Sequence, residues 1–319
     1  MNLVWLLAGI GLLTAGGEIL IRGSLAAATR LGVSPLLCGL VIVGFGTSAP
    51  ELVVSVTAAI ERQPDIAIGN VVGSNIGNGL LILGVCGLIR PLYVRPLALF
   101  RDATTGIAAS ILFLLLAAGS ALGRFDSVIL LSAFVLYLGW AYWSERYHSA
   151  PSAQVHEAEA QEISALPNSV FWTVASVIGG LMLLIGGSRV LLAGAVGISE
   201  DIGVSEAAIG LILVAVGTSL PELTISVLAT LRNHIDVAVG NVLGSNIFNL
   251  LGILGVSALL QPLPIHDRIL QFDQWVLLGS SILVLLLLYT AKRLARWEGG
   301  ILLAGYAGYC LLSFTTYSG

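Results

Sequence analysis

Charged residues are scarce in this sequence. Lys, Arg, Asp and Glu make up 10% of its 319 residues, whereas 57% of the residues are hydrophobic. A soluble domain usually carries about 25% charged residues. The low charge and the long apolar runs exclude a soluble globular protein. They indicate an integral membrane protein whose partner is the lipid bilayer, and no nucleic-acid partner is expected.

Cysteine and histidine are also rare. Cys38, Cys86 and Cys310 lie singly inside apolar segments, so neither a disulfide framework nor a thiolate metal site is expected. The four histidines fall between the apolar segments, and the sequence contains neither a His-Glu-x-x-His zinc motif nor a phosphate-binding loop ending in Gly-Lys. We therefore expect neither an enzyme nor a cofactor.

Long apolar segments make up most of the chain. A transmembrane helix needs about 20 mostly apolar residues. Ten segments meet this requirement: 3–28, 36–60, 66–89, 100–121, 126–144, 170–198, 207–231, 237–260, 272–291 and 298–316. The sequence thus predicts an all-α integral membrane protein with ten transmembrane helices.

The basic residues of the connecting loops are unevenly distributed. With the loops numbered in order, nine lie in odd loops and only three, Arg62, Arg124 and Arg268, lie in even loops. Cytoplasmic loops are enriched in Lys and Arg. We therefore expect a multi-pass protein of the cell (inner) membrane, with both termini extracytoplasmic and the central loop cytoplasmic.

The chain contains an internal repeat. Residues 44–84 align without a gap with residues 215–255, at an offset of 171, and 23 of the 41 positions are identical. The polar stretch 148–169, a predicted cytoplasmic linker, separates residues 1–147 from residues 170–319. Five helices per half is an odd number, so the two halves are expected to be inverted repeats with the binding site near the membrane midplane.

Each half carries one glutamate inside an apolar segment. Glu51 ends the motif Gly-Thr-Ser-Ala-Pro-Glu, and Glu222 ends Gly-Thr-Ser-Leu-Pro-Glu. A charged side chain at the bilayer centre costs about 2.5–3.5 kcal/mol, which protonation, hydrogen bonds between helices or a bound cation must offset. Thr47 and Ser48 share a helix face with Glu51, which favours the cation. The proline before each glutamate lacks an N–H and strains its turn of the helix, which is expected to leave main-chain oxygens free at the level of the glutamate.

More oxygen-bearing side chains recur on the next apolar segment of each half. Ser74 and Asn78 are four residues apart and share a helix face, as do Ser245 and Asn249. Na⁺ and Ca²⁺ prefer oxygen ligands of this kind. The two segments together therefore predict a site for a hard cation.

Other polar residues near these segments have simpler explanations. Asp65 and Asp236 stand where helices are expected to begin and are predicted to be N-caps. Glu18 and Arg22 are four residues apart on one helix and are expected to form an ion pair. Four asparagines suit interhelical hydrogen bonding as well as ion ligation: Asn70, Asn75, Asn241 and Asn246.

The repeated segments resemble the α-repeats of the cation/calcium antiporter superfamily, specifically its sodium/calcium exchanger branch, and the short chain is similar to the prokaryotic members. The resemblance implies that Na⁺ entry drives Ca²⁺ out by alternating access, with the helices near 3–28 and 170–198 sliding across the rest. It also implies the cation-binding groups, which are the side chains of Thr47, Ser48, Glu51, Ser74, Asn78, Thr218, Ser219, Glu222, Ser245 and Asn249 and the main-chain oxygens of Gly44 and Ala215. The glutamates would bind both Ca²⁺ and Na⁺, and the Thr and Ser hydroxyls and the main-chain carbonyls would complete the Na⁺ sites.

A Na⁺/Ca²⁺ antiporter is the expected function, and a Ca²⁺/H⁺ antiporter of the same superfamily is the alternative. Proton-driven relatives typically carry Asn where Ser48 and Ser219 stand, which favours Na⁺ as the driving ion. Potassium-dependent relatives carry Asp where Asn249 stands, which argues against K⁺ co-transport. A cation channel or an intramembrane enzyme fits less well. The oligomeric state is left open by the sequence.

Overall fold

The computed structural model describes residues 2–33, 35–93, 96–147, 169–201, 218–290 and 293–317. Most of these residues are helical, because a chain in lipid must satisfy its backbone hydrogen bonds internally. The helices of the first half are α1 (Asn2–Leu31), α2 (Pro35–Cys38), η1 (Gly39–Gly44), α3 (Phe45–Thr47), α4 (Ala49–Ile60), α5 (Pro64–Gly77), η2 (Asn78–Ile82), α6 (Leu83–Ile89), α7 (Pro96–Ala117) and α8 (Arg124–Tyr147). Those of the second half are α10 (Val170–Asp201), α12 (Leu220–Leu231), α13 (Ile235–Ile247), η3 (Phe248–Ile253), α14 (Leu254–Leu260), η4 (Ile269–Asp273), α15 (Gln274–Thr290) and α16 (Arg296–Tyr317). The η elements are π-helical turns, and the all-α fold class is confirmed.

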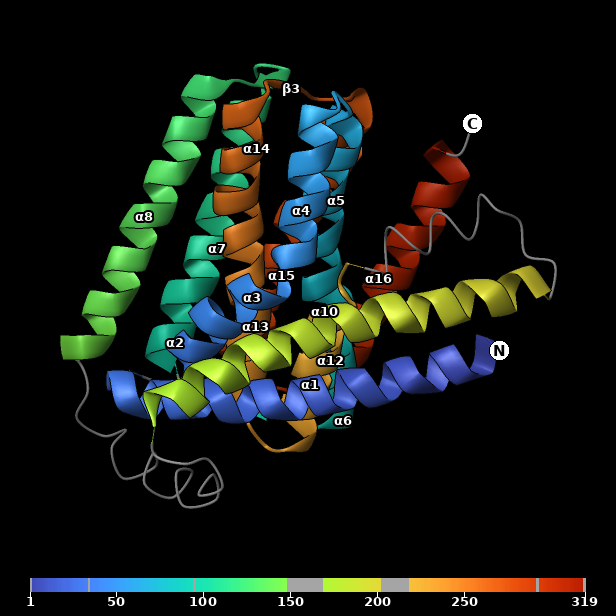
Figure 1. Cartoon of the computed structure of the whole chain (residues 1–319). Coiled ribbons are helices and arrows are strands. Elements are labelled where there is room, and N and C mark those ends of the chain that lie inside the picture. The colour runs from blue at the N-terminus through green and yellow to red at the C-terminus, as the bar shows by residue number, and fades with distance from the viewer. Residues whose placement is uncertain are drawn as a thin grey trace.

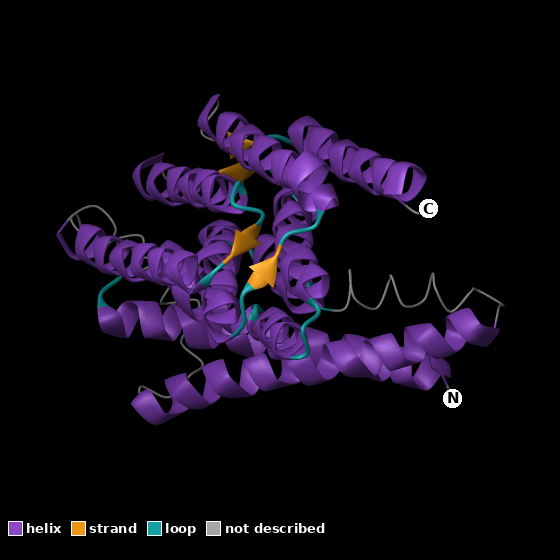
Figure 2. Cartoon of the chain, turned by 90° about the horizontal axis from the view of Figure 1, so that it is seen from above, coloured by secondary structure: helices purple, strands orange, loops and turns teal. Residues whose placement is uncertain are grey.

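The two long helices α1 and α10 lie side by side and run across the other helices (Figures 1 and 2). They are antiparallel, because Gly9 in the N-terminal part of α1 faces Leu191 in the C-terminal part of α10. Glycines recur at every seventh position of the contacting faces, at Gly9, Gly16 and Gly23 of α1 and at Gly180, Gly187 and Gly194 of α10. Small residues of this kind let two helix backbones approach closely within a membrane.

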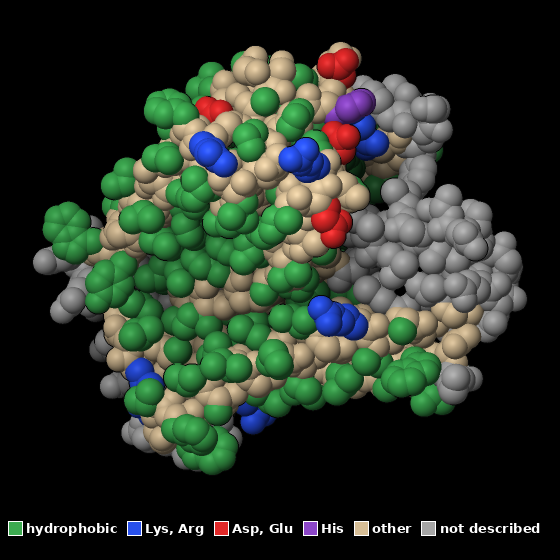
Figure 3. Space-filling model, turned by 45° about the horizontal axis from the view of Figure 1, so that its top comes forward, with side chains coloured by type: hydrophobic (Ala, Val, Ile, Leu, Met, Phe, Trp, Pro, Cys, Tyr) green, Lys and Arg blue, Asp and Glu red, His purple; other side chains and the backbone are tan. Residues whose placement is uncertain are grey.

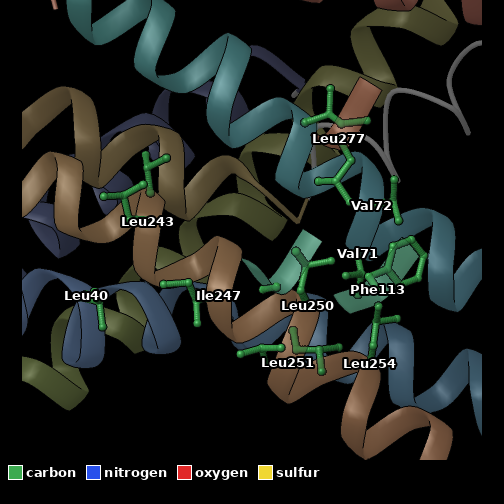
Figure 4. Packing of buried hydrophobic residues seen from close by; sticks show 14 of the residues in the cluster. Leu40, Val71, Val72, Phe113, Leu243, Ile247, Leu250, Leu251, Leu254 and Leu277 are labelled. Atoms are coloured by element: carbon green, nitrogen blue, oxygen red, sulfur yellow. The ribbon is translucent and has the colours of Figure 1, made fainter. Parts of the chain in front are cut away.

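The interior of the bundle is built on two interrupted helices. The segments Pro64–Ile89 (α5, η2 and α6) and Ile235–Leu260 (α13, η3 and α14) are 72% and 78% buried in their most apolar part, against 33% or less for the other long apolar helices. Buried side chains such as Val71, Phe113 and Leu254 join them to α7 in one hydrophobic cluster (Figure 4). These two segments therefore form the centre of the protein.

Several helices are suited to a bilayer. Among the described residues, six helices are long and apolar enough to cross a membrane, or seven if the bent pair Leu40–Thr47 and Ala49–Ile60 is one span. Three other predicted segments overlap described helices. Segment 100–121 overlaps α7, the described part of 207–231 contains α12, and 298–316 lies within α16. Hydrophobic side chains cover much of the face shown in Figure 3, as expected for a surface that contacts lipid.

Four short strands connect loops that are far apart in sequence. Strand β1 (Leu92–Tyr93) pairs antiparallel with β4 (Arg293–Leu294). Strand β2 (Ala121–Leu122) pairs in the same way with β3 (Leu263–Pro264). The linker 148–169 lies outside the described residues except for Ser169.

The predicted N-caps at Asp65 and Asp236 are wrong. The N-cap residues of α5 and α13 are Gln63 and His234, so both aspartates lie in the first helical turn. In α5 the reason is Pro64, since proline lacks an N–H and its fixed φ suits the first helical position. The aspartates still stabilise these helices, because a carboxylate near an N-terminus interacts favourably with the helix dipole.

The predicted ion pair between Glu18 and Arg22 is confirmed. The Arg22 guanidinium lies 2.7 Å from Glu18 Oε1, and Arg232 lies 3.0 Å from Glu18 Oε2. The pair thus joins α1 to the end of α12. Its exposed position makes it a useful reference for the buried ionic contacts described below.

Candidate cation-binding site

A break in each half positions the two glutamates. In the first half, the chain bends by 49° between Leu40–Thr47 and Ala49–Ile60. Ser48 at the break has φ −80° and ψ 9°, and its counterpart Ser219 has φ −89° and ψ 4°. Each proline occupies the first turn that follows, as its sequence position predicts. Glu51 and Glu222 consequently lie at helix N-termini, where the dipole favours negative charge.

Each glutamate is bonded by a serine of the opposite half. The Ser48 hydroxyl donates to Glu222 Oε1 at 2.9 Å, and the Ser219 hydroxyl lies 3.3 Å from Glu51 Oε1. Ser219 also lies 3.4 Å from the Ser74 hydroxyl. Glu51 is 1% exposed and Glu222 is fully buried. The Oε2 atom of each glutamate has no hydrogen-bond partner among the described residues.

Asparagines hold the helices on which the glutamates lie. Asn241 donates to the Glu222 main-chain oxygen at 3.2 Å and to Ser226 at 2.8 Å, and its Oδ1 accepts a hydrogen bond from Thr47 at 3.0 Å. The same contacts recur in the other half at the offset of 171, among Asn70, Glu51, Ser55 and Thr218. Thr47 and Thr218 therefore each contact the asparagine that supports the glutamate of the other half.

The main-chain oxygen of Gly44 belongs to the same network. It accepts a hydrogen bond from the Ser245 hydroxyl at 2.9 Å and lies 3.3 Å from the Thr47 hydroxyl. This contact joins η1 to α13, which Gly244 allows because a Cβ there would overlap the Leu40 backbone. Ala215, the equivalent of Gly44, lies outside the described residues.

Four asparagines on the two central segments form a further cluster. Asn78 donates to Asn246 Oδ1 at 3.0 Å, and Asn249 donates to Asn75 Oδ1 at 2.9 Å. The Oδ1 atoms of Asn78 and Asn249 are buried and have no partner in the described part of the chain. Asn78 and Asn249 each stand four residues after the serine of the same segment, Ser74 or Ser245.

Hydrogen bonds link the predicted Thr and Ser residues of the described part to the glutamates, to the asparagines that support them, to one another or to the Gly44 oxygen, whereas Asn78 and Asn249 bond Asn246 and Asn75. Sequence reasoning missed the supporting roles of Ser55 and Ser226, although their identity at the offset of 171 was a signal. It left Asn75 and Asn246 open between two roles, and they prove to bond across the two halves. The carboxylate and amide oxygens left without a partner in the described part of the chain are ligands of the kind that a hard cation such as Na⁺ or Ca²⁺ prefers.

Comparison with known proteins identifies the family. The family model described as sodium/calcium exchanger protein matches residues 1–143 and 172–315. The chain belongs to the sodium/calcium exchanger family. Its members are membrane antiporters of Ca²⁺ and a second cation, and the family is not an enzyme class, which agrees with the coarse expectation from sequence.

Individual relatives of this exchanger match along almost its whole length. A putative antiporter, CaxA of Alkalimonas amylolytica, is 36% identical over 98% of both chains. The sodium/calcium exchanger MaX1 of Methanosarcina acetivorans is 31% identical over 98% of this chain and 99% of its own. A solved structure of the exchanger NCX_Mj, soaked with Na⁺ and Ca²⁺, is 30% identical, superposes with a TM-score of 0.81, and covers 99% of this chain and 98% of its own.

Proposed function

We propose that this exchanger couples Na⁺ movement to Ca²⁺ movement across the cell (inner) membrane by alternating access. One observation carries the proposal. Four buried oxygens, Glu51 Oε2, Glu222 Oε2, Asn78 Oδ1 and Asn249 Oδ1, have no hydrogen-bond donor among the described residues. A buried acceptor without a partner costs about 1–3 kcal/mol, and more when it is charged. A cation bound among these oxygens offsets that cost.

The charge of the site accounts for competition between the two ions. Two ionised glutamates carry a charge of −2, which one Ca²⁺ neutralises. Na⁺ ions in the same oxygen cluster neutralise it equally well, with the hydroxyls of Thr47, Ser48, Ser74, Thr218, Ser219 and Ser245 as further ligands. Because the ions share the glutamates, they exclude each other, and mutual exclusion is what exchange requires.

The hydrogen bonds support an architecture of ten transmembrane helices in two inverted repeats. Contacts recur in pairs at the offset of 171, as when Ser48 binds Glu222 and Ser219 binds Glu51. The strand pairs are consistent with it, since β1–β4 joins the third and ninth loops and β2–β3 joins the fourth and eighth. An even number of spans lies between the loops of each pair, so each pair belongs on one side of the membrane.

The long helices supply the moving part of this proposal. Helices α1 and α10 contact each other closely along their glycines and lie against α12, which carries Glu222. A pair that slides as one body across the site would open it to one side of the membrane at a time. The distribution of basic residues favours cytoplasmic odd loops, extracytoplasmic termini and a cytoplasmic central linker.

A flux assay tests the proposed function. Vesicles that contain the purified protein and are loaded with Na⁺ should take up Ca²⁺ when diluted into Na⁺-free buffer, and the Glu51→Gln, Glu222→Gln double variant should not. Glu61→Gln is the matched control, because Glu61 is an exposed acid at the C-terminal end of α4, the helix whose N-terminus carries Glu51. Uptake driven by a pH gradient and indifferent to Na⁺ would instead establish the Ca²⁺/H⁺ antiporter.

A further inference from the structure

Asn75 and Asn246 lie where the two central segments meet, one in each half. We propose that they are positioning residues that turn the amides of Asn78 and Asn249 so that each presents its oxygen, and not its NH₂ group, to the cation. This inference rests on the proposed cation site. It assigns the ion affinity of the site partly to two residues that need not touch the ion.

Two main-chain carbonyls determine how the amides of Asn75 and Asn246 are oriented. The Asn75 amide nitrogen lies 2.9 Å from the Asn246 main-chain oxygen, and the Asn246 amide nitrogen lies 3.3 Å from the Asn75 main-chain oxygen. A carbonyl oxygen can only accept a hydrogen bond. Each of the two amides must therefore direct its NH₂ group at the carbonyl, which determines its orientation.

The orientation of the second pair follows from the first. With their NH₂ groups engaged, Asn75 and Asn246 present only their Oδ1 atoms to Asn249 and Asn78, at 2.9 and 3.0 Å. Each of these Oδ1 atoms needs a hydrogen-bond donor. The NH₂ group of Asn249 must therefore face Asn75, and the NH₂ group of Asn78 must face Asn246. If either amide were rotated by 180°, two acceptor oxygens would be brought within about 3 Å of each other without a proton between them.

The consequence appears at the far side of each amide. The Oδ1 atoms of Asn78 and Asn249 are buried and have no partner among the described residues. An amide oxygen is a suitable ligand for Na⁺ or Ca²⁺, whereas an NH₂ group repels a cation. Asn75 and Asn246 thus fix the amides of Asn78 and Asn249 so that each supplies an oriented oxygen ligand.

A double-mutant cycle on Ca²⁺ binding tests the inference. Equilibrium Ca²⁺ binding is measured on the purified full chain in detergent for the wild type, Asn75→Ala, Asn249→Asp and the double variant. Asn75→Ala should raise the Ca²⁺ Kd by about tenfold, because the hydrogen bond that orients the Asn249 amide toward the ion is lost. Aspartate at position 249 has two equivalent oxygens and no NH₂ group to misorient. In the Asn249→Asp background, therefore, Asn75→Ala should not raise the Kd, because it removes the acceptor oxygen that would otherwise lie against the aspartate carboxylate.

The controls separate positioning from packing. If Asn75→Ala raised the Kd equally in both backgrounds, Asn75 would act by packing and the inference would be overturned. The mirror cycle with Asn246→Ala and Asn78→Asp gives an independent test if one variant fails to fold. Ser110→Ala should leave the Kd unchanged, because Ser110 lines the small cavity beside Asn75 but, among the described residues, bonds only Ser281 and the Gly106 carbonyl.

The outcome is also separable from that of the flux assay. A wild type that binds Ca²⁺ but shows no Na⁺-driven uptake would end the proposed exchange, while the binding cycle would still decide the role of Asn75. A wild type that binds no Ca²⁺ would overturn both.

Discussion

Replacement of Gly244 by alanine should separate the two halves at the site. The added Cβ would overlap the Leu40 carbonyl oxygen and lie 2.6 Å from Leu40 Cα and 2.7 Å from the Leu40 carbonyl carbon. Carbon atoms in contact are normally about 3.5–4.0 Å apart, so α13 and η1 would have to move apart by about 1 Å. The atoms that block the new methyl group are backbone, and a change of rotamer cannot relieve the overlap.

The displacement has two measurable effects. Overpacking of this kind typically costs about 1–3 kcal/mol, which lowers the melting temperature of the purified protein in detergent. The hydrogen bond from the adjacent Ser245 to the Gly44 oxygen, now 2.9 Å long, would lengthen to about 4 Å and break. Ca²⁺ uptake into Na⁺-loaded vesicles should therefore fall by more than the loss of folded protein explains.

Gly139→Ala on α8 is the matched control, because a Cβ there meets no described atom within 4 Å. Alanine is favoured over glycine inside a helix by about 0.5–1 kcal/mol, so this variant should be at least as stable as the wild type and transport normally. If Gly244→Ala melted and transported like Gly139→Ala, the close approach of η1 and α13 would not be essential, and the reasoning would be refuted.

Two further predictions concern parts of the protein outside the site. Asp102→Asn should destabilise the protein by about 1.5–3 kcal/mol in thermal unfolding, because it removes the charge of a buried carboxylate that lies 2.6 Å from the Arg101 guanidinium and accepts a hydrogen bond from Tyr137. Glu18→Gln breaks an exposed pair and should cost no more than about 1 kcal/mol, so equal losses would contradict this account. Gly180→Ala should lower both the melting temperature and uptake, since a Cβ would lie 2.7 Å from the Leu20 nitrogen of α1. Gly179→Ala meets no described atom within 4 Å and should have neither effect, and the same loss in both variants would count against a close α1–α10 contact.

Much of the candidate site follows from the sequence alone. The repeat at the offset of 171 relates Glu51 to Glu222, and helical periodicity groups each with its neighbouring hydroxyls, because side chains three and four residues apart share a face. The position of each proline predicts a strained turn with free main-chain oxygens beside each glutamate. Apolar length and composition determine the membrane class and the all-α fold, since a helix satisfies its backbone hydrogen bonds within its own segment.

Only the tertiary structure decided which serine bonds to which glutamate. Periodicity places Ser48 on the face of Glu51, yet the Ser48 hydroxyl bonds Glu222, because the glycine-mediated approach of the halves brings a different carboxylate within reach. The buried contacts of Asp102 with Arg101 and Tyr137 were likewise not predicted, since Tyr137 lies on another helix. The orientation of the Asn78 and Asn249 amides also depended on the fold. A sequence specifies that an amide is present, but only its hydrogen-bond partners across the helix interface determine whether the oxygen or the nitrogen faces the ion.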